Sequence, residues 1–383
     1  MANWKSKVLS IIGKLDDVSD SVRSRVKSLT GHDDALIIQP YFGHGTMRRV
    51  VLSGRVLEDE GVMPSVDADT GWENLVNLYK RFESDEVPGA RVRVRFGELE
   101  QDVTSNSEGY FSFSAELNNH LDTRLWQDAD LELLEPQVAG GRSVRAVGRI
   151  MIPPATAKFG VISDIDDTVV VSNVTNKAKL LLTVALLNER TRVPFEGVAS
   201  FYRALQDGVS GSENNPIFYV SKSPWNLYTL LVEFFGIHGI PQGPLFLRDV
   251  GINQPSPEDQ HKVSRIESIL DTYPDLPFVL IGDSGEQDPE IYRDLVKAYP
   301  DRIRAIYIRS VDPDASRIAA IDQLISEVRE TRSQLILASD TEFAATHAAA
   351  EGLISTSALA VIRSEKQIDQ NSPSPIEIAT DVA

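Results

Sequence analysis

Short apolar runs alternate with helical stretches from Phe159 to about Val311 of this 383-residue chain. Runs of Val, Ile, Leu and Phe without polar alternation are typical of strands that are buried on both faces of a sheet. Five such runs are FGVISD, NPIFYVS, GPLFLRD, PFVLIGD and IRAIYIR, and two of the helical stretches between them are SPWNLYTLLVEFFGIHG and HKVSRIESILDTY. The alternation predicts an α/β domain with a doubly wound parallel sheet and helices on both faces.

The rest of the chain divides into four further segments. Residues 1–35 have an apolar stripe at helical spacing and are expected to form an amphipathic helix. Residues 36–150 carry short strand patterns between turns, which indicates a small β-sandwich-like domain that loosely resembles transthyretin-like or immunoglobulin-like sandwiches. We expect the α/β domain to span 151–312, a C-terminal helical extension to span 313–363, and the polar tail 364–383 to be disordered.

Two of these segments allow more than one interpretation. The basic N-terminal helix, with Trp4 in its apolar stripe, either lies on a membrane surface, packs on its own domain or forms a short coiled coil. In the β domain, ARVRVRF alternates strictly, so that Arg91, Arg93 and Arg95 share one face of a strand. That face is either a solvated sheet surface or a surface that binds anions.

Composition excludes several classes of function. The chain has 38 basic and 56 acidic side chains, a net charge of −18, which repels nucleic acid. It has no cysteine, which rules out disulfides and cysteine-ligated metal sites. GxSxG, HExxH and P-loop motifs are absent, as are a secretory signal pattern and any apolar run of about 18 residues. We expect a cytoplasmic protein that contacts membranes at most peripherally, and the sequence identifies no protein partner.

Polar side chains follow three of the predicted strands at the point where each strand ends. Because the carboxyl ends of parallel strands meet at one edge of the sheet, we expect these side chains to lie close together. A lysine at the start of a predicted helix joins them. The candidate residues are Asp164, Asp166, Thr168, Ser221, Lys262, Asp283 and Asp288.

The acidic members of this set indicate a cation site. Carboxylates crowded together are unfavourable unless positive charge neutralises them. Asp164 and Asp166 are two residues apart, so both side chains point to the same side of an extended segment. With Asp283 and Asp288 they offer only oxygen ligands, and no histidine cluster accompanies them, which suits Mg²⁺ better than zinc. We therefore predict Mg²⁺ as the cofactor, with these four aspartates as its ligands.

The same residues supply the parts of a phosphoryl transfer. Asp164 is the candidate nucleophile, which would form an aspartyl-phosphate. Asp166 would give a proton to the leaving oxygen and later take one from water. Ser221 and Lys262 would bind the phosphoryl oxygens as charge develops, and Thr168 completes the set of candidate catalytic residues.

Four motifs resemble those of the haloacid dehalogenase (HAD) phosphohydrolases: DIDDT after a strand, a strand-end Ser, a helix-start Lys, and IGDSGEQD. The resemblance implies an HAD-like fold, a nucleophile at Asp164, an acid/base at Asp166 and a Mg²⁺ site completed by the last motif. Asp167 departs from the pattern, because many members carry Gly there. Lys222 competes with Lys262 for the lysine role, but its place beside Ser221 favours a position facing the substrate or the surface.

A closer resemblance covers roughly residues 140–312. FGVISDIDDTVVVS, FYVSKSPWNLY, HKVSRIESIL and FVLIGDSGEQDPEIY are similar to the catalytic domain of the actin-patch-type phosphatidate phosphatases. That resemblance implies Mg²⁺-dependent removal of phosphate from phosphatidate, which leaves diacylglycerol. Two alternatives stay open: the same chemistry on a protein or a soluble phosphoester, and a membrane-associated scaffold in which catalysis is secondary.

The spacing of the motifs bears on the size of the substrate. Asp164 and Ser221 are 57 residues apart, and about 40 residues separate Ser221 from Lys262, so neither gap holds a large cap domain. An uncovered site admits a phosphorylated lipid or another bulky phosphomonoester. Trp225 either dips into a bilayer surface or is packed within the protein. LLLTVALL, residues 180–187, is either a lipid-facing flap or a core helix.

Overall fold

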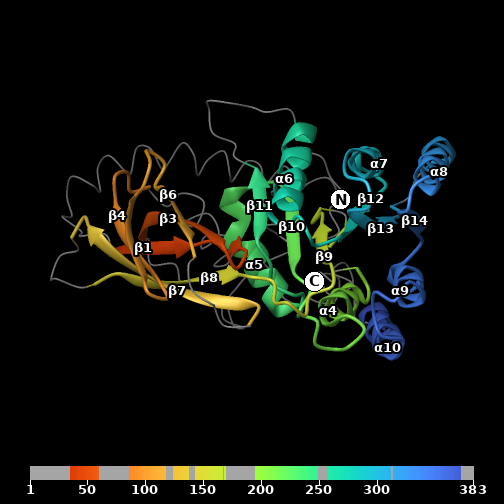
Figure 1. Ribbon diagram of the computed structural model, residues 1–383, viewed down its shortest axis with the longest axis horizontal. Coiled ribbons are helices and arrows are strands. Elements are labelled where there is room, and N and C mark those ends of the chain that lie inside the picture. The colour runs from red at the N-terminus through yellow and green to blue at the C-terminus, as the bar shows by residue number, and fades with distance from the viewer. Residues whose placement is uncertain are drawn as a thin grey trace, which may run out of the picture.

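The computed structural model describes residues 35–59, 86–117, 124–137, 143–166, 168–169, 195–248, 258–311 and 314–371. Figure 1 shows two units side by side, one made of strands and one in which helices flank a sheet. The predicted helix of residues 1–35 lies outside the described residues except for Ala35, and so do Asp167 and LLLTVALL. The prediction that no large cap is present rests on the spans from Asp164 to Ser221 and from Ser221 to Lys262. Residues 170–194 and 249–257 of these spans also lie outside the described residues.

The N-terminal unit is one mixed sheet of eight strands that folds around a single core. The strand order is β1-β3-β2-β8-β7-β4-β5, with β6 paired to β3. Side chains from both halves of the sheet meet in the core, among them Leu52, Val92, Phe113 and Leu131. The strand patterns ALIIQPYF, RRVVLSGRVLED, ARVRVRF and GYFSFSAEL of the sequence are present as β1, β3, β4 and β6. The strands are β1 Ala35–Pro40, β2 Gly43–Gly45, β3 Arg49–Asp59, β4 Arg91–Phe96, β5 Leu99–Thr104, β6 Tyr110–Glu116, β7 Trp126–Glu135 and β8 Arg145–Met151.

The arginine face of β4 is neutralised within the sheet. Each arginine pairs with carboxylates of the neighbouring strands β5 and β7, and exposed pairs of this kind contribute little to stability. This arrangement favours a solvated sheet surface over an anion-binding one. The pairs are Arg91–Glu135 at 2.9 Å, Arg93–Asp102 at 2.8 Å, Arg95–Glu100 at 2.8 Å and Arg95–Glu132 at 3.1 Å.

The second unit contains a parallel sheet of six strands in the order β11-β10-β9-β12-β13-β14. The first three strands are laid down in one direction and the last three in the other, which makes the sheet doubly wound. All five predicted strands are present, as β9 to β13. The strands are β9 Gly160–Ser163, β10 Ile217–Pro224, β11 Leu245–Arg248, β12 Phe278–Asp283, β13 Ile303–Arg309 and β14 Gln334–Ala338.

Helices cover both faces of this sheet (Figure 1). Successive strand residues point to opposite faces, so Val161 packs into one core and Ile162 into the other. None of the helices in the described ranges is long and apolar enough to cross a bilayer. One face carries α4 Val198–Asp207, α5 Tyr228–Ile237, α9 Thr341–Ala350 and α10 Ala358–Asn371, and the other carries α6 Glu258–Thr272, α7 Asp288–Ala298 and α8 Ala315–Arg329.

The C-terminal segments differ from the prediction. Residues 313–363, expected to be a helical extension, contain β14, which pairs in parallel with β13 and so extends the sheet. A five-residue strand with four apolar residues, lying between two helices, cannot be assigned from periodicity alone. Helix α10 also continues into residues 364–371, which were expected to be disordered. There Lys366 pairs with Asp340 at 3.0 Å, and Asp369 accepts the backbone N–H of Gly197 at 2.8 Å.

Aromatic side chains join the two units. Tyr41, between β1 and β2, stacks on Trp225 with ring centroids 4.6 Å apart and lies 4.4 Å from Tyr228. The backbone N–H of Phe42 donates to the hydroxyl of Tyr228 at 2.7 Å. Trp225 therefore packs within the protein, as one of the two interpretations predicted. Because Trp225 directly follows β10, the β domain supports the loop at the end of that strand.

A histidine of β2 gives this interface a pH dependence that can be measured. The His44 ring lies 5.4 Å from the Phe246 ring, and its Nδ1 lies 3.4 Å from the Tyr273 hydroxyl. Burial lowers the pKa of His44 to about 4, below the value near 6.5 that it has in an unfolded chain. The unfolded chain therefore binds the proton first. His44 stabilises the fold fully above pH 6.5 and progressively less as the pH falls towards 4.

The expected loss from His44 over this range is about 2–3 kcal/mol, since the ring keeps some exposure. It is measured by urea unfolding of the wild type and of His44→Phe at pH 7 and pH 4.5. The variant should show the smaller drop in the free energy of unfolding. Equal drops for the two proteins would contradict the shift.

Candidate active site

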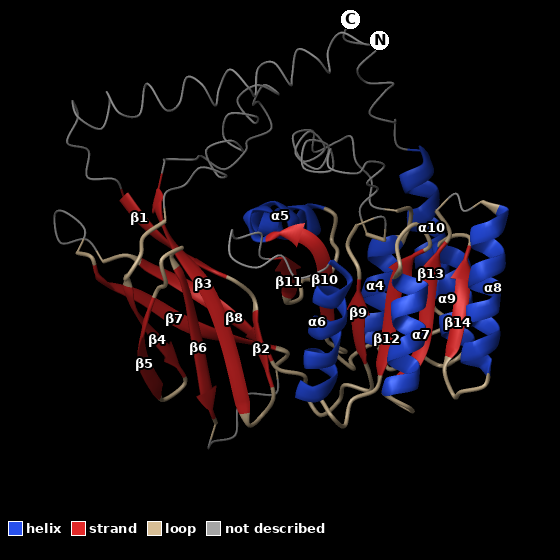
Figure 2. Ribbon diagram, turned by 90° about the horizontal axis from the view of Figure 1, so that it is seen from above, coloured by secondary structure: helices blue, strands red, loops and turns tan. Residues whose placement is uncertain are grey.

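The strand order brings the ends of β9 and β12 together at the point where the winding reverses. Ser163 pairs with Ile281 across these two strands, and the backbone N–H of Asp164 donates to the carbonyl of Ile281 at 2.9 Å. Figure 2 shows β9 and β12 side by side within the sheet. Doubly wound sheets bind ligands at this position, outside the carboxyl ends of the strands. Asp164 and Asp283 therefore lie at the edge where the sequence predicts the site.

Three of the predicted residues form a buried carboxylate cluster. Asp164, Asp283 and Asp288 each offer an oxygen atom, and these oxygens lie within 4.8 Å of one another. All three side chains are at most 1% exposed. Gly282 makes room for the third, because a Cβ at that position would lie 2.2 Å from Oδ2 of Asp288. The same Oδ2 accepts the backbone N–H of Asp283 at 3.3 Å.

Lys262 projects from α6 into this cluster. Its Nζ lies 2.9 Å from Oδ1 of Asp164, pairs with Oδ1 of Asp288 and lies 3.5 Å from Glu286. The side chain is 1% exposed. Burial by itself lowers the pKa of Lys262, but Asp164 and Asp288 raise it well above its usual value. Lys262 is therefore a charged ammonium and supplies positive charge at the centre of the cluster.

One ammonium does not balance three carboxylates, and the cluster keeps free acceptor atoms. Oδ2 of Asp164 and Oδ2 of Asp283 are buried without a hydrogen-bond partner among the described residues. Burial, and then repulsion from Asp288 and Glu286, raises the pKa of Asp283 to about 7. Burial also raises the pKa of Asp164. Unpaired acceptors and surplus negative charge are what a divalent cation with oxygen ligands requires, so the donor set fits Mg²⁺.

Asp166 lies beside the cluster but faces another way. Its Oδ2 accepts hydrogen bonds from the hydroxyls of Ser221, at 2.8 Å, and Ser223, at 3.2 Å. The structure thus brings Ser221 and Asp166 together as predicted. It does not place the Asp166 carboxylate in the group of three that could hold a metal ion. Burial raises the pKa of Asp166, against the hydrogen bond from Ser221.

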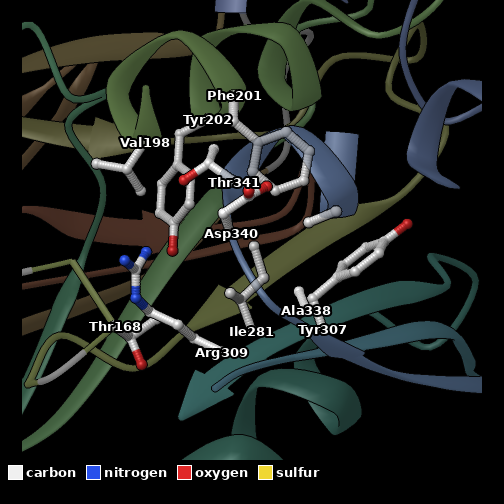
Figure 3. Close-up of a pocket in the computed structure, with 11 residues that line it drawn as sticks. Thr168, Val198, Phe201, Tyr202, Ile281, Tyr307, Arg309, Ala338, Asp340 and Thr341 are labelled. Atoms are coloured by element: carbon white, nitrogen blue, oxygen red, sulfur yellow. The ribbon is translucent and has the colours of Figure 1, made fainter. Parts of the chain in front are cut away.

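Thr168 lies near these residues, at the wall of a small hollow (Figure 3). Its side chain is 3% exposed, and its Oγ1 has no hydrogen-bond partner in the described part of the chain. The hollow measures about 30 Å³, which is room for about one water molecule. Apolar and aromatic side chains, including Tyr202 and Tyr307, form most of its wall. The charged side chain of Arg309 also lines it. It is too small to hold a substrate.

Glu286, at the rim of the site, was not assigned a role from the sequence. The carboxylate of Glu286 lies 3.2 Å from Nζ of Lys222 and so bridges Lys222 and Lys262. The structure also separates the two competing lysines, because Lys262 is buried in the carboxylate cluster and Lys222 lies at the rim, 21% exposed. The signal for Glu286 was its place as an acidic residue inside DSGEQD, but the loop conformation decides where it points.

Sequence comparison assigns the strand-helix segment that carries these residues. Residues 159–310 match the family model for the catalytic domain of phosphatidate phosphatase APP1. This segment is APP1-like. The match confirms the resemblance to the actin-patch-type phosphatidate phosphatases over residues 159–310.

Two curated relatives each match a little over two fifths of the chain. Phosphatidate phosphatase APP1 of Saccharomyces cerevisiae is 33% identical over 169 residues, which are 43% of this chain and 28% of that protein. An uncharacterized protein of Schizosaccharomyces pombe is 34% identical over 160 residues, which are 41% of this chain and 26% of that protein. The match spans about a quarter of the length of each relative.

Solved structures give only distant likenesses. A carbohydrate acetylesterase from Xanthomonas citri aligns with a TM-score of 0.25 and 12% identity over 76% of this chain and 72% of that one. A β-glucuronidase from Bifidobacterium dentium aligns with a TM-score of 0.24 and 10% identity over 79% of this chain and 60% of that one. At these scores the alignments support no inference about fold or function.

Proposed function

We propose that the protein is a Mg²⁺-dependent phosphomonoester hydrolase of HAD type that removes phosphate from phosphatidate and leaves diacylglycerol. The observation that carries the proposal is the buried cluster of Asp164, Asp283 and Asp288 around Lys262, inside a segment similar to the APP1 catalytic domain. Asp283, through its unpaired Oδ2, and Asp288 would hold the ion together with the Asp164 carboxylate. When bound, Mg²⁺ offsets the negative charge of the cluster and of the phosphoryl group.

The nucleophile is Asp164. One of its oxygens attacks the phosphorus atom, the bond from phosphorus to the ester oxygen breaks, and an aspartyl-phosphate forms. Lys262 holds Oδ1 of Asp164 at 2.9 Å, which fixes the rotamer and leaves Oδ2 free of hydrogen bonds within the described ranges. A carboxylate that is fixed and free of competing hydrogen bonds is positioned for this attack.

Asp166 is the acid and then the base. Its raised pKa favours the protonated form, which gives its proton to the leaving oxygen. Water then attacks the phosphorus atom of the aspartyl-phosphate, Asp166 takes the proton of that water, and inorganic phosphate leaves Asp164. The hydroxyls of Ser221 and Ser223 orient the Asp166 carboxyl group throughout.

The proposal is tested by phosphate release from phosphatidate in mixed micelles, with Mg²⁺ or with a chelator, using the full chain. We expect release with Mg²⁺ and loss of release with the chelator. Metal-dependent release from an aryl phosphate but not from phosphatidate would keep the mechanism and overturn the lipid substrate in favour of a protein or soluble phosphoester. No release from either substrate would overturn the enzyme assignment in favour of a membrane-associated scaffold.

A further inference from the structure

Arg317 projects from α8 onto the loop that connects Asp283 to Asp288. Its Nε donates to the carbonyl of Ser284 at 2.8 Å, and its Nη2 donates to the carbonyl of Glu286 at 2.6 Å. The other side of the guanidinium binds the carboxylate of Glu290 on α7, through Nη1 and through Nη2 at 3.1 Å. The planar guanidinium group of Arg317 therefore links the backbone of the loop between Asp283 and Asp288 to α7 and α8.

The hydrogen bonds of Arg317 act on the peptide group that also orients Asp283. The carbonyl of Ser284 and the N–H of Gly285 belong to the same peptide unit. Arg317 binds its carbonyl, while Oδ1 of Asp283 accepts its N–H at 2.7 Å. The N–H of Glu286 donates to the same Oδ1 at 2.9 Å. Rotation of this peptide would remove a hydrogen bond from Asp283 and turn its carboxylate within the cluster.

We propose that Arg317 is a positioning residue for the carboxylate cluster and sets how tightly the site binds Mg²⁺. The inference rests on the proposed function, because it assumes that Asp283 holds the ion. Arg317 lies outside residues 159–310, the range that matches the family model. Substitution of a residue that orients a metal ligand commonly lowers the metal affinity strongly.

The variant that isolates this role is Arg317→Lys. Lysine keeps the positive charge near Asp283 but cannot bind two carbonyls and a carboxylate with one planar group. The matched control is Arg293→Lys on α7. Arg293 is 20% exposed against 25% for Arg317, and it pairs with Glu327 at 2.7 Å. None of the hydrogen bonds recorded for Arg293 in the described ranges reaches the 283–288 loop.

The measurement is the rise in melting temperature of the full chain as Mg²⁺ is added without substrate. In Arg317→Lys the Mg²⁺ concentration that produces a given rise should increase about 10–100-fold, and Arg293→Lys should respond like the wild type. The KM for phosphatidate at saturating Mg²⁺ should not change. Glu290→Ala, which frees the guanidinium on one side, should raise that Mg²⁺ concentration less and keeps the test available if Arg317→Lys folds poorly.

The outcomes separate the inference from the function on which it rests. A wild type that responds to Mg²⁺ and an Arg317→Lys variant that shows the same rise at the same Mg²⁺ concentrations would overturn the positioning role and leave the metal site standing. A wild type whose melting temperature ignores Mg²⁺ would overturn the metal site itself, and the inference with it.

Discussion

Asp164→Asn is expected to lower phosphate release from phosphatidate by about 10³-fold or more, because the variant loses the attacking carboxylate. The change is nearly isosteric, and the side chain is 1% exposed, so water has little room to replace the lost nucleophile. The measurement is phosphate release by the full chain at saturating Mg²⁺. A second measurement is the acid-quenched covalent phosphoenzyme, which should form in the wild type and be absent from Asp164→Asn.

Two further variants serve as a control and a comparison for Asp164→Asn. Asp322→Asn makes the same chemical change on the exposed face of α8 and should keep wild-type activity. Asp166→Asn retains the nucleophile but removes the group that transfers the proton, so it should slow turnover. If Asp164→Asn released phosphate at a rate close to that of the wild type, the aspartyl-phosphate mechanism would be wrong even if phosphatidate were the substrate.

The parts of the site that follow strand ends could be predicted from the sequence. Burial on both faces gives β9, β10 and β12 continuous apolar runs, so their ends are visible in the sequence. Once the strands are known, the parallel topology decides that Asp164, Ser221 and Asp283 share an edge. Lys262 was predictable for a related reason, since its helix begins at the same edge.

The parts that depend on loop conformation could not be predicted in this way. Strand β9 ends at Ser163, so the two-residue spacing that holds in a strand does not put the Asp166 carboxylate in the cluster, and it faces Ser221 instead. Arg317 reaches the acidic loop only because α8 packs beside α7. Tyr41 meets Trp225 across more than 180 residues of sequence, and no local pattern encodes a contact of that kind.

The C-terminal strand shows a limit of a different kind. Gln334–Ala338 is short and lies between two helices, and its four apolar residues are too few to distinguish a strand from a turn of helix. Its pairing with β13 is a long-range contact that supplies the missing information. Similarly, the order in residues 364–371 comes from polar contacts such as Lys366–Asp340, which composition does not reveal.

Lys262→Met is expected to destabilise the fold by about 3–5 kcal/mol in the presence of a chelator, because it leaves buried carboxylates without their counter-charge. Asp164 and Asp288 both pair with this ammonium, and all three side chains are at most 1% exposed. Methionine has a similar length and no charge, so the change tests electrostatics more than packing. The measurement is urea unfolding at pH 7, with chelator and with Mg²⁺.

The response of this variant to Mg²⁺ shows whether Lys262 neutralises the carboxylates together with a divalent cation or alone. If Lys262 and a divalent cation both neutralise the same carboxylates, Mg²⁺ should stabilise Lys262→Met more than the wild type, because no ammonium competes for Asp164. The matched control is Lys366→Met, whose lysine is 15% exposed and pairs with Asp340 at 3.0 Å. It should lose about 1 kcal/mol or less and show the wild-type response to Mg²⁺. A Lys262→Met variant that Mg²⁺ stabilises no more than the wild type would mean that the cluster is held by the lysine alone.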